Sequence, residues 1–83
     1  MLYEIIFSDE ATRQLQKLEK EIQKRIITTL ERIRIRPEAY LKRLVGYQAY
    51  RLRVGDYRVI IDLDQNKLMI LVIKIGHRKN IYE

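Results

Sequence analysis

The feature that most constrains the fold of this chain is the alternation of apolar and polar side chains over Tyr50–Leu63. A period of two is typical of a β-hairpin with one buried face. Gly55-Asp56 lies at the centre of the run and predicts a two-residue turn, because glycine adopts the backbone conformation that such turns require. Arg53 then lies directly opposite Arg58, and both share with Arg51 the face opposite the apolar side chains.

The residues before this hairpin predict one strand and two helices. Residues 1–7 are rich in Ile, Tyr and Phe, as strands are. Ser8 or Asp9 caps a first helix, whose apolar residues recur at helical spacing. A second helix carries a single apolar stripe, made of Ile22, Ile26, Leu30 and Ile33. Pro37 ends this helix, because the residue before a proline is pushed out of helical geometry.

After the hairpin, a polar turn of two or three residues within 64–67 leads into the most apolar strand, residues 68–75, which Gly76 closes. The element order is therefore β-α-α-β-β-β. We predict an α+β fold in which two N-terminal helices pack on one face of a small twisted, mainly antiparallel sheet. With 83 residues and no visible linker or repeat, the chain is expected to form one domain, residues 1–83.

Charge is distributed unevenly along the chain. The net charge is +6 at pH 7, and almost all of the excess falls in the second half. Such a bias predicts a polyanionic partner: nucleic acid first, an acidic protein second, an anionic membrane third. The alternative is that the excess of Lys and Arg only keeps the protein soluble.

Several classes of protein are excluded by what the sequence lacks. There is no cysteine and only one histidine, so neither a disulfide framework nor a metal site is expected. The sequence has no glycine-rich phosphate loop, so a nucleotide cofactor is not expected. No stretch resembles a signal peptide or reaches the length of a membrane span, so we expect a cytoplasmic protein without a membrane partner.

The hairpin carries the arrangement that most strongly indicates a function. Like charges directly opposed across a hairpin are destabilising unless they point into water or share an anion. Arginine suits the second role, because its planar guanidinium grips phosphate oxygens through two hydrogen bonds. The alternative is that the three arginines simply occupy a solvated sheet face. Asp62 lies on the same face and could pair with one of them.

The residues after Gly76 form a second candidate element. His77, Arg78 and Tyr82 combine an imidazole, a fixed cation and a phenol near the end of the apolar strand. Taken singly, a histidine is more often structural and a terminal tyrosine more often packs. Four further basic residues of this half are predicted to bind an RNA backbone: Lys42, Arg43, Lys74 and Lys79.

Three stretches carry a family resemblance: Leu44–Tyr47, Tyr50–Ile61 and Ile75–Tyr82. Their hairpin and their Gly-His-Arg ending resemble the RelE/ParE superfamily of toxins, and the RelE branch most. RelE-type toxins are ribosome-dependent endoribonucleases that cut mRNA in the A site, and an antitoxin encoded beside them holds them inactive. The resemblance implies the same reaction here, in which the ribose 2′-hydroxyl attacks the adjacent phosphate and leaves a 2′,3′-cyclic phosphate.

The resemblance also implies roles for individual residues in that reaction, which needs a base, cations and an acid. Arg51 and Arg53 stand where the family places basic residues, and Arg58 matches its phosphate-binding arginine. Arg78 matches an arginine linked to stabilisation of the leaving group. Tyr82 matches a terminal tyrosine that stacks on the nucleotide or activates it.

Two departures from the family pattern affect these roles. Some members carry lysine where this chain has Arg51 and Arg53, and that lysine has been proposed as the base. Arginine is a poor base because it stays protonated, so His77 or Tyr82 must serve, and we favour His77 slightly. The sequence also ends at Glu83, without the C-terminal helix of some members, so regulation by displacing that helix is not expected.

Two other functions remain open at this point, and all three share one expected partner. A ParE-like toxin would poison gyrase without cutting RNA, and an inactive relative would only bind RNA or antitoxin. For any of them we expect an acidic, amphipathic, RelB-like antitoxin. It would wrap the domain and either cover Arg51, Arg53 and Arg58 or displace the residues after Gly76.

Overall fold

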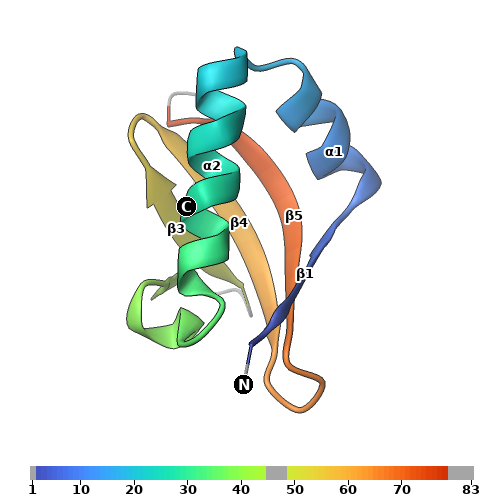
Figure 1. Ribbon diagram of the computed structural model, residues 1–83, viewed down its shortest axis with the longest axis vertical. Helices are drawn as coiled ribbons and strands as arrows, with labels where there is room; N and C mark the ends of the chain where they lie inside the picture. The colour runs from blue at the N-terminus through green and yellow to red at the C-terminus, as the bar shows by residue number, and fades with distance from the viewer. Residues whose placement is uncertain (1, 45–48, 79–83) are drawn as a thin grey trace.

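A computed structural model of the chain describes residues 2–44 and 49–78 (Figure 1). Its elements are, in order, β1 (Glu4–Phe7), α1 (Asp9–Gln16), α2 (Lys20–Ile33), the short 3₁₀ helix η1 (Pro37–Ala39), β2 (Lys42–Arg43), β3 (Tyr50–Val54), β4 (Tyr57–Asp64) and β5 (Met69–His77). The described part has principal extents of 32 × 27 × 22 Å. No helix in it is long and apolar enough to cross a membrane.

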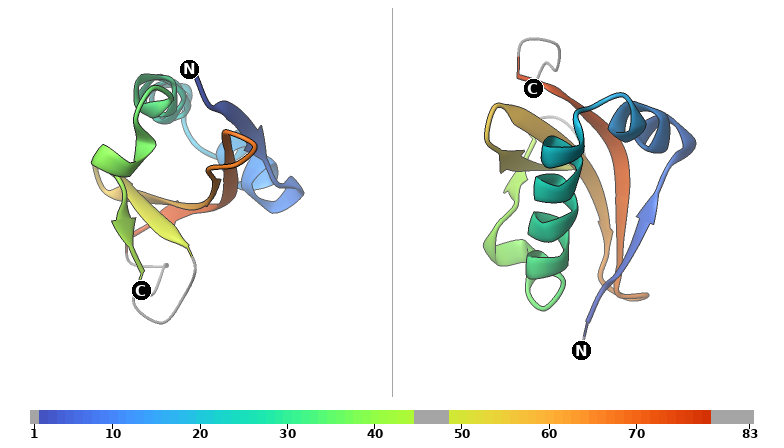
Figure 2. Two further views of the ribbon diagram at one scale, coloured as in Figure 1. Left: turned by 90° about the horizontal axis from the view of Figure 1, so that it is seen from below. Right: turned by 45° about the horizontal axis from the view of Figure 1, so that its top comes forward.

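The strands form one mixed sheet with both long helices on the same face. Its order is β1-β5-β4-β3-β2, with β1 parallel to β5 and every other pair antiparallel. Figure 2, seen from below, shows α2 over one side of the sheet, and Ala11 of α1 belongs to the same buried cluster as Ile26 and Leu30 of α2. The predicted α+β fold and element order are confirmed. The two-residue strand β2 was not predicted, because so short a strand carries no period.

The core lies between the helices and the inner face of the sheet. From α2, Ile26, Leu30 and Ile33 are at most 1% exposed, as their predicted stripe requires. From the sheet, Val59 and Ile61 of β4 are fully buried beneath them, with neighbours on β5. Burial of a branched side chain contributes about 1.5–3 kcal/mol, so this one contact layer dominates the stability of so small a chain.

The first helix is capped as predicted, and the second ends earlier than predicted. The Ser8 hydroxyl oxygen accepts the Ala11 N–H at 3.0 Å, so Ser8 is the N-cap and Asp9 the first helical residue. The helix α2 ends at Ile33, ahead of Pro37, which instead opens η1. At the C-cap of α2, the Arg34 side chain donates to the Tyr3 carbonyl oxygen at 2.7 Å and forms an ion pair with Glu31 of the last turn.

A bulge in β5 is held by side chains of the first helix. Ile60 pairs with Lys74 and Ile61 with Val72, which leaves Ile73 without a partner on β4. The Ser8 hydroxyl donates to the Ile73 carbonyl oxygen at 2.8 Å. Beyond the bulge, the inner face continues at Ile75 instead of residue 74, so Lys74 lies on the outer face. The strand runs on to His77 and is not closed by Gly76.

The turn between β4 and β5 is longer than predicted. Asp64 pairs with Met69, so four residues, 65–68, separate the strands rather than two or three. The Asp64 carboxylate accepts the N–H groups of Asn66 and Lys67 at 3.1 and 3.0 Å. Leu68 takes a positive φ of 54°, an uncommon conformation for a branched residue, and this bend lets the chain enter β5 after four residues.

The bulge predicts a specific stabilising role for Gln14. Its Oε1 accepts the Ile75 N–H at 2.6 Å, and Ile75 is only 3% exposed. Replacing Gln14 by Ala leaves that N–H without a partner and should lower the free energy of unfolding by about 1–3 kcal/mol. Urea denaturation of Gln14→Ala measures it. The control is Gln16→Ala on the exposed side of the same helix, and equal losses in the two variants would contradict the role.

Candidate nucleic-acid interface

The sheet face that the helices leave uncovered carries a cluster of basic side chains. Two rows of paired residues cross it. The first runs Lys42, Arg51, Ile60, Lys74 over strands β2 to β5, and the second runs Arg53, Arg58, Gly76 over β3 to β5. Directly paired residues share a face. We call the five basic residues of these rows, Lys42, Arg51, Arg53, Arg58 and Lys74, the basic face.

The predicted register of the hairpin is confirmed in full. Val54 pairs with Tyr57 and Arg53 with Arg58, so two guanidinium-bearing residues stand directly opposite each other. Arg53 is exposed, and Arg58 is partly buried. Their Cβ atoms in such a pair are about 5 Å apart, a spacing at which two guanidinium groups can hold one phosphate between them.

The Gly55-Asp56 turn joins the basic face to the end of β5. Gly55 has a φ of +60°, and Asp56 keeps a negative φ, the pattern of a type II′ turn with glycine first. The Asp56 carbonyl oxygen accepts the Arg78 N–H at 2.9 Å. The Arg53 Nε lies 3.5 Å from the Gly55 carbonyl oxygen. The two carbonyl oxygens of the turn are therefore contacted by the Arg78 N–H and by the Arg53 guanidinium.

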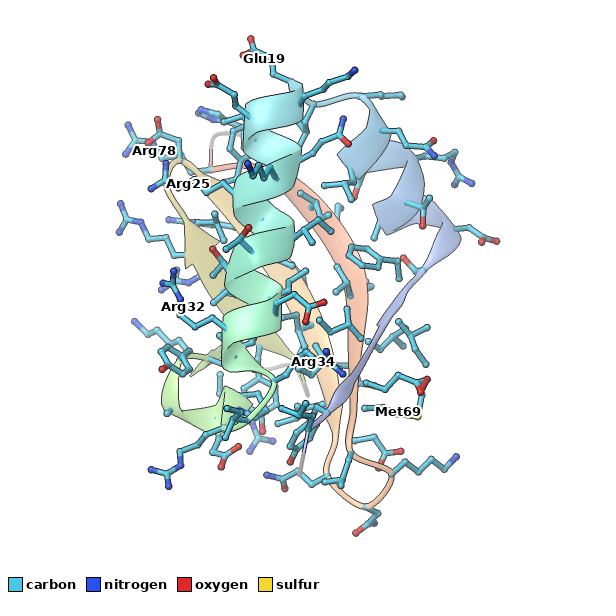
Figure 3. All side chains as sticks on the ribbon, viewed as in Figure 1. Glu19, Arg25, Arg32, Arg34, Met69 and Arg78 are labelled. Atoms are coloured by element: carbon cyan, nitrogen blue, oxygen red, sulfur yellow. The ribbon has the colours of Figure 1, made fainter. Side chains whose placement is uncertain are left out.

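A further arginine lies at the same turn and was missed in the sequence. A Cβ atom built on Gly55 would be 3.1 Å from Nη1 of Arg25, so the Arg25 guanidinium covers the turn. Figure 3 shows Arg25 and Arg78 close together at this end of the molecule. The signal that could have revealed Arg25 is its spacing of seven from Arg32 on α2, which puts both on one helix face.

His77 lies on the other face from the three hairpin arginines. It pairs with Tyr57, whose face is the inner one, while Arg58 pairs with Gly76 on the outer face. The His77 and Tyr57 rings meet edge to face with their centroids 5.4 Å apart. By register the imidazole is therefore directed away from the basic face. Tyr50 and Tyr57 also lie on the inner side, by their pairing with Ile61 and Val54, and both are partly buried.

The remaining candidates divide between the basic face and its margin. Lys42 and Lys74 are exposed on the basic face, whereas Arg43 pairs with Tyr50 and so faces the other way. Asp62 is exposed, and it forms no ion pair with any residue that the structure describes. Within the described residues, the basic face is therefore not neutralised by this carboxylate.

Some predictions fall on residues 45–48 and 79–83, which lie outside the described part of the chain. They include Lys79 and Tyr82. Over residues 2–44 and 49–78, no three side chains among His, Asp and Glu are grouped so that they could hold a metal ion. The described site thus consists of the cations of the basic face with Arg25 and Arg78 beside its turn, and the His77 imidazole lies on the other face.

Comparison with known proteins agrees with this fold. The chain belongs to the family described as the ParE toxin of the parDE type II toxin–antitoxin system, whose model matches residues 5–82, and thereby to the RelE/ParE superfamily of toxins. A putative RelE-like toxin protein of Escherichia coli is 27% identical over 82 residues, covering 95% of this chain and 86% of that protein. The resemblance to the superfamily is confirmed.

Solved structures resemble this chain over nearly its whole length. The toxin–antitoxin complex RelBE2 from Mycobacterium tuberculosis contains a chain that matches with a TM-score of 0.84 and 22% identity, covering 94% of this chain and 100% of that one. The archaeal RelE–RelB complex from Pyrococcus horikoshii matches with a TM-score of 0.80 and 26% identity, covering 98% and 100%. At 22% identity, the match to the M. tuberculosis chain shows a shared fold and nothing more.

The opposed pair on the hairpin predicts that the basic face lowers stability when no anion is bound. Replacing Arg53 by Gln removes the like charge facing Arg58. The free energy of unfolding should rise by roughly a few tenths of a kcal/mol in low salt and should show no gain in high salt. Denaturant titrations at both salt concentrations measure this.

The matched control removes one positive charge from an exposed turn, as Lys67→Gln. It lowers the net charge equally but does not touch the opposed pair. If Lys67→Gln stabilises the protein as much as Arg53→Gln does, the effect belongs to net charge and not to the hairpin register.

Proposed function

We propose that the protein is a ribosome-dependent mRNA endoribonuclease whose basic face holds the phosphodiester that is cut. The observation that carries the proposal is the register of the hairpin, which opposes Arg53 and Arg58 and aligns Lys42, Arg51 and Lys74 with them. Such a row of cations is well suited to a phosphate backbone. The E. coli relative at 27% identity, described as a putative RelE-like toxin, supports the same assignment.

The cations of the basic face would act on charge that develops during the reaction. Attack by the 2′-hydroxyl oxygen forms a bond to phosphorus, and the bond from phosphorus to the 5′-oxygen then breaks. Arg58, partly buried at the centre of the site, would stabilise the non-bridging oxygens of the phosphorane. Arg78, held beside the turn by its N–H, would stabilise the 5′-oxygen as it leaves.

The proton from the 2′-hydroxyl group needs a separate acceptor. Arginine does not serve, because it keeps its proton at any working pH. His77 faces the helix side by its pairing with Tyr57, which weighs against the role given to it from sequence. Tyr82 remains the other candidate from the family pattern. The proposal therefore attributes most of the rate enhancement to electrostatic stabilisation of the transition state and to positioning of the RNA.

An antitoxin is the second proposed partner. The matching chains from M. tuberculosis and P. horikoshii were solved in toxin–antitoxin complexes, the second with RelB. We expect a RelB-like antitoxin with an acidic amphipathic segment to cover Arg51, Arg53 and Arg58. Its carboxylates would pair with these arginines and so exclude RNA from the same surface. Since the substrate lies on ribosomes, we expect the toxin to work in the cytoplasm.

Inhibition of gyrase is a second candidate, favoured by one observation. The family whose model matches this chain is described as the ParE toxin, and ParE-type toxins poison gyrase. A gyrase inhibitor has no need of a guanidinium pair placed to stabilise a phosphorane. The two functions therefore differ in whether Arg58 is needed for mRNA cleavage.

Replacing Arg58 by Ala should abolish mRNA cleavage while the antitoxin still binds. Loss of one preorganised donor to a developing oxyanion lowers a rate by about 10²- to 10³-fold. The measurement is primer extension of mRNA on programmed ribosomes, with free mRNA alongside. Arg13→Ala, on the exposed side of α1, is the control. No cleavage by folded, toxic wild-type protein would favour gyrase, and an Arg58→Ala variant as active as wild type would refute the site.

The proposed chemistry predicts which atom of the RNA is needed. A single 2′-deoxy nucleotide on the 5′ side of the cut removes the attacking oxygen, so cleavage there should be lost while binding persists. Cut fragments from all-ribose mRNA should carry a 2′,3′-cyclic phosphate, visible by mass spectrometry. Cleavage at the deoxy position would show that water is the nucleophile and would exclude the proposed reaction.

A further inference from the structure

A groove between α2 and the hairpin holds a second group of cations. It has a volume of about 590 Å³, and its lining includes Lys24, Arg25, Thr28 and Arg32 of α2 and Arg53 and Gly55 of the hairpin. We call it the α2 groove. Figure 3 shows Arg25 and Arg32 on the side of α2 toward the hairpin.

No acid of the described residues, 2–44 and 49–78, forms an ion pair with the cations of the α2 groove. Glu21 also lines the groove and stands four residues before Arg25, a spacing that allows an ion pair on a helix. The structure does not form it. Among the described residues, no carboxylate lies within 4.0 Å of Lys24, Arg25 or Arg32. The groove therefore presents an excess of positive charge.

The α2 groove is continuous with the basic face through one residue. Arg53 belongs to the basic face by its pairing with Arg58, and it also lines the groove. The strand β2 pairs only with Tyr50 and Arg51, so no strand of the described part of the chain lies next to the edge of β3 beside Arg53. An RNA strand that crosses the basic face can pass this edge and enter the groove while it stays in contact with positively charged side chains.

The lining favours a nucleic-acid backbone over a protein segment. Val54 is the one apolar side chain among the described residues that line the groove, and it is only 5% exposed. An amphipathic acidic helix needs an apolar surface to bury its own apolar face, and the groove offers almost none. Arginine and lysine side chains, with the Thr28 hydroxyl, are instead the donors that proteins use on phosphate oxygens.

We propose that the α2 groove is an extended subsite for the same RNA strand that the basic face holds, gripping the backbone of nucleotides that flank the cut. The inference rests on the proposed endonuclease function and adds to it: the substrate would be bound on both sides of the β3 edge, with Arg53 between the two parts. The grip is to phosphates, so it does not depend on base sequence.

The test measures how the affinity for short and long RNA changes when positive charge is removed from the groove. Toxin freed of antitoxin is titrated with a fluorescent trinucleotide and with a single-stranded RNA of about twelve nucleotides. The variant is Lys24→Gln/Arg32→Gln. The matched control, Arg13→Gln/Lys17→Gln, removes the same charge from exposed positions of α1 and its C-cap. Gln preserves helix propensity at all four sites.

We expect the groove variant to bind the longer RNA on the order of tenfold more weakly than the control variant does. Its log–log salt dependence should flatten by about 1.4, because two phosphate contacts are lost at about 0.7 each for a single strand. The trinucleotide should bind equally to both variants. A loss with the trinucleotide as large as with the longer RNA would overturn the inference, as would equal losses in groove and control variants.

Two more outcomes separate this inference from its alternatives. If the groove variant loses affinity for an acidic antitoxin and none for RNA, the groove belongs to a protein partner and the inference is wrong. If wild-type toxin does not cut mRNA on ribosomes but its binding shows the expected dependence on length, the endonuclease proposal fails and the RNA subsite stands.

Discussion

The register of the β3–β4 hairpin is the constraint on which both the core and the basic face depend. Side chains alternate across a sheet, so a slip of one residue would turn Val59 and Ile61 toward solvent and Arg58 toward the helices. Burial of the two apolar residues beneath α2 makes that slip costly. The II′ turn at Gly55 adds a local preference for the same pairing. One register thus fixes stability and site together.

Features of the fold that are set by neighbouring residues could be predicted from the sequence. Features that depend on contacts between distant residues could not. The hairpin pairing and the Ser8 cap follow from patterns within a few residues. The bulge at Ile73 does not, because Ser8 and Gln14 hold it from more than 60 residues away in sequence. The turn after Asp64 was misjudged because its length depends on side-chain hydrogen bonds and on one positive φ.

The same division applies to the candidate site. The arginines of the hairpin were placed correctly because a period of two fixes their face. His77 was grouped with them because it is near in sequence, whereas the register puts its ring against Tyr57 on the inner side. The charges of α2 were overlooked because acidic and basic residues nearly cancel in number over residues 1–41, with seven acidic and eight basic side chains. Helical geometry separates them in space and brings Arg25 and Arg32 to one groove.

The parallel pairing of β1 with β5 also orders the events of folding. β5 lies between β1 and β4 in the sheet, although it comes last among the described strands. While the chain is being synthesised, β1 and the helix α1 that packs on β5 have no strand to join until residues 69–77 have left the ribosome exit tunnel. Contacts so distant in sequence close late and slowly. The sheet that bears the basic face is therefore completed only after β5 has emerged.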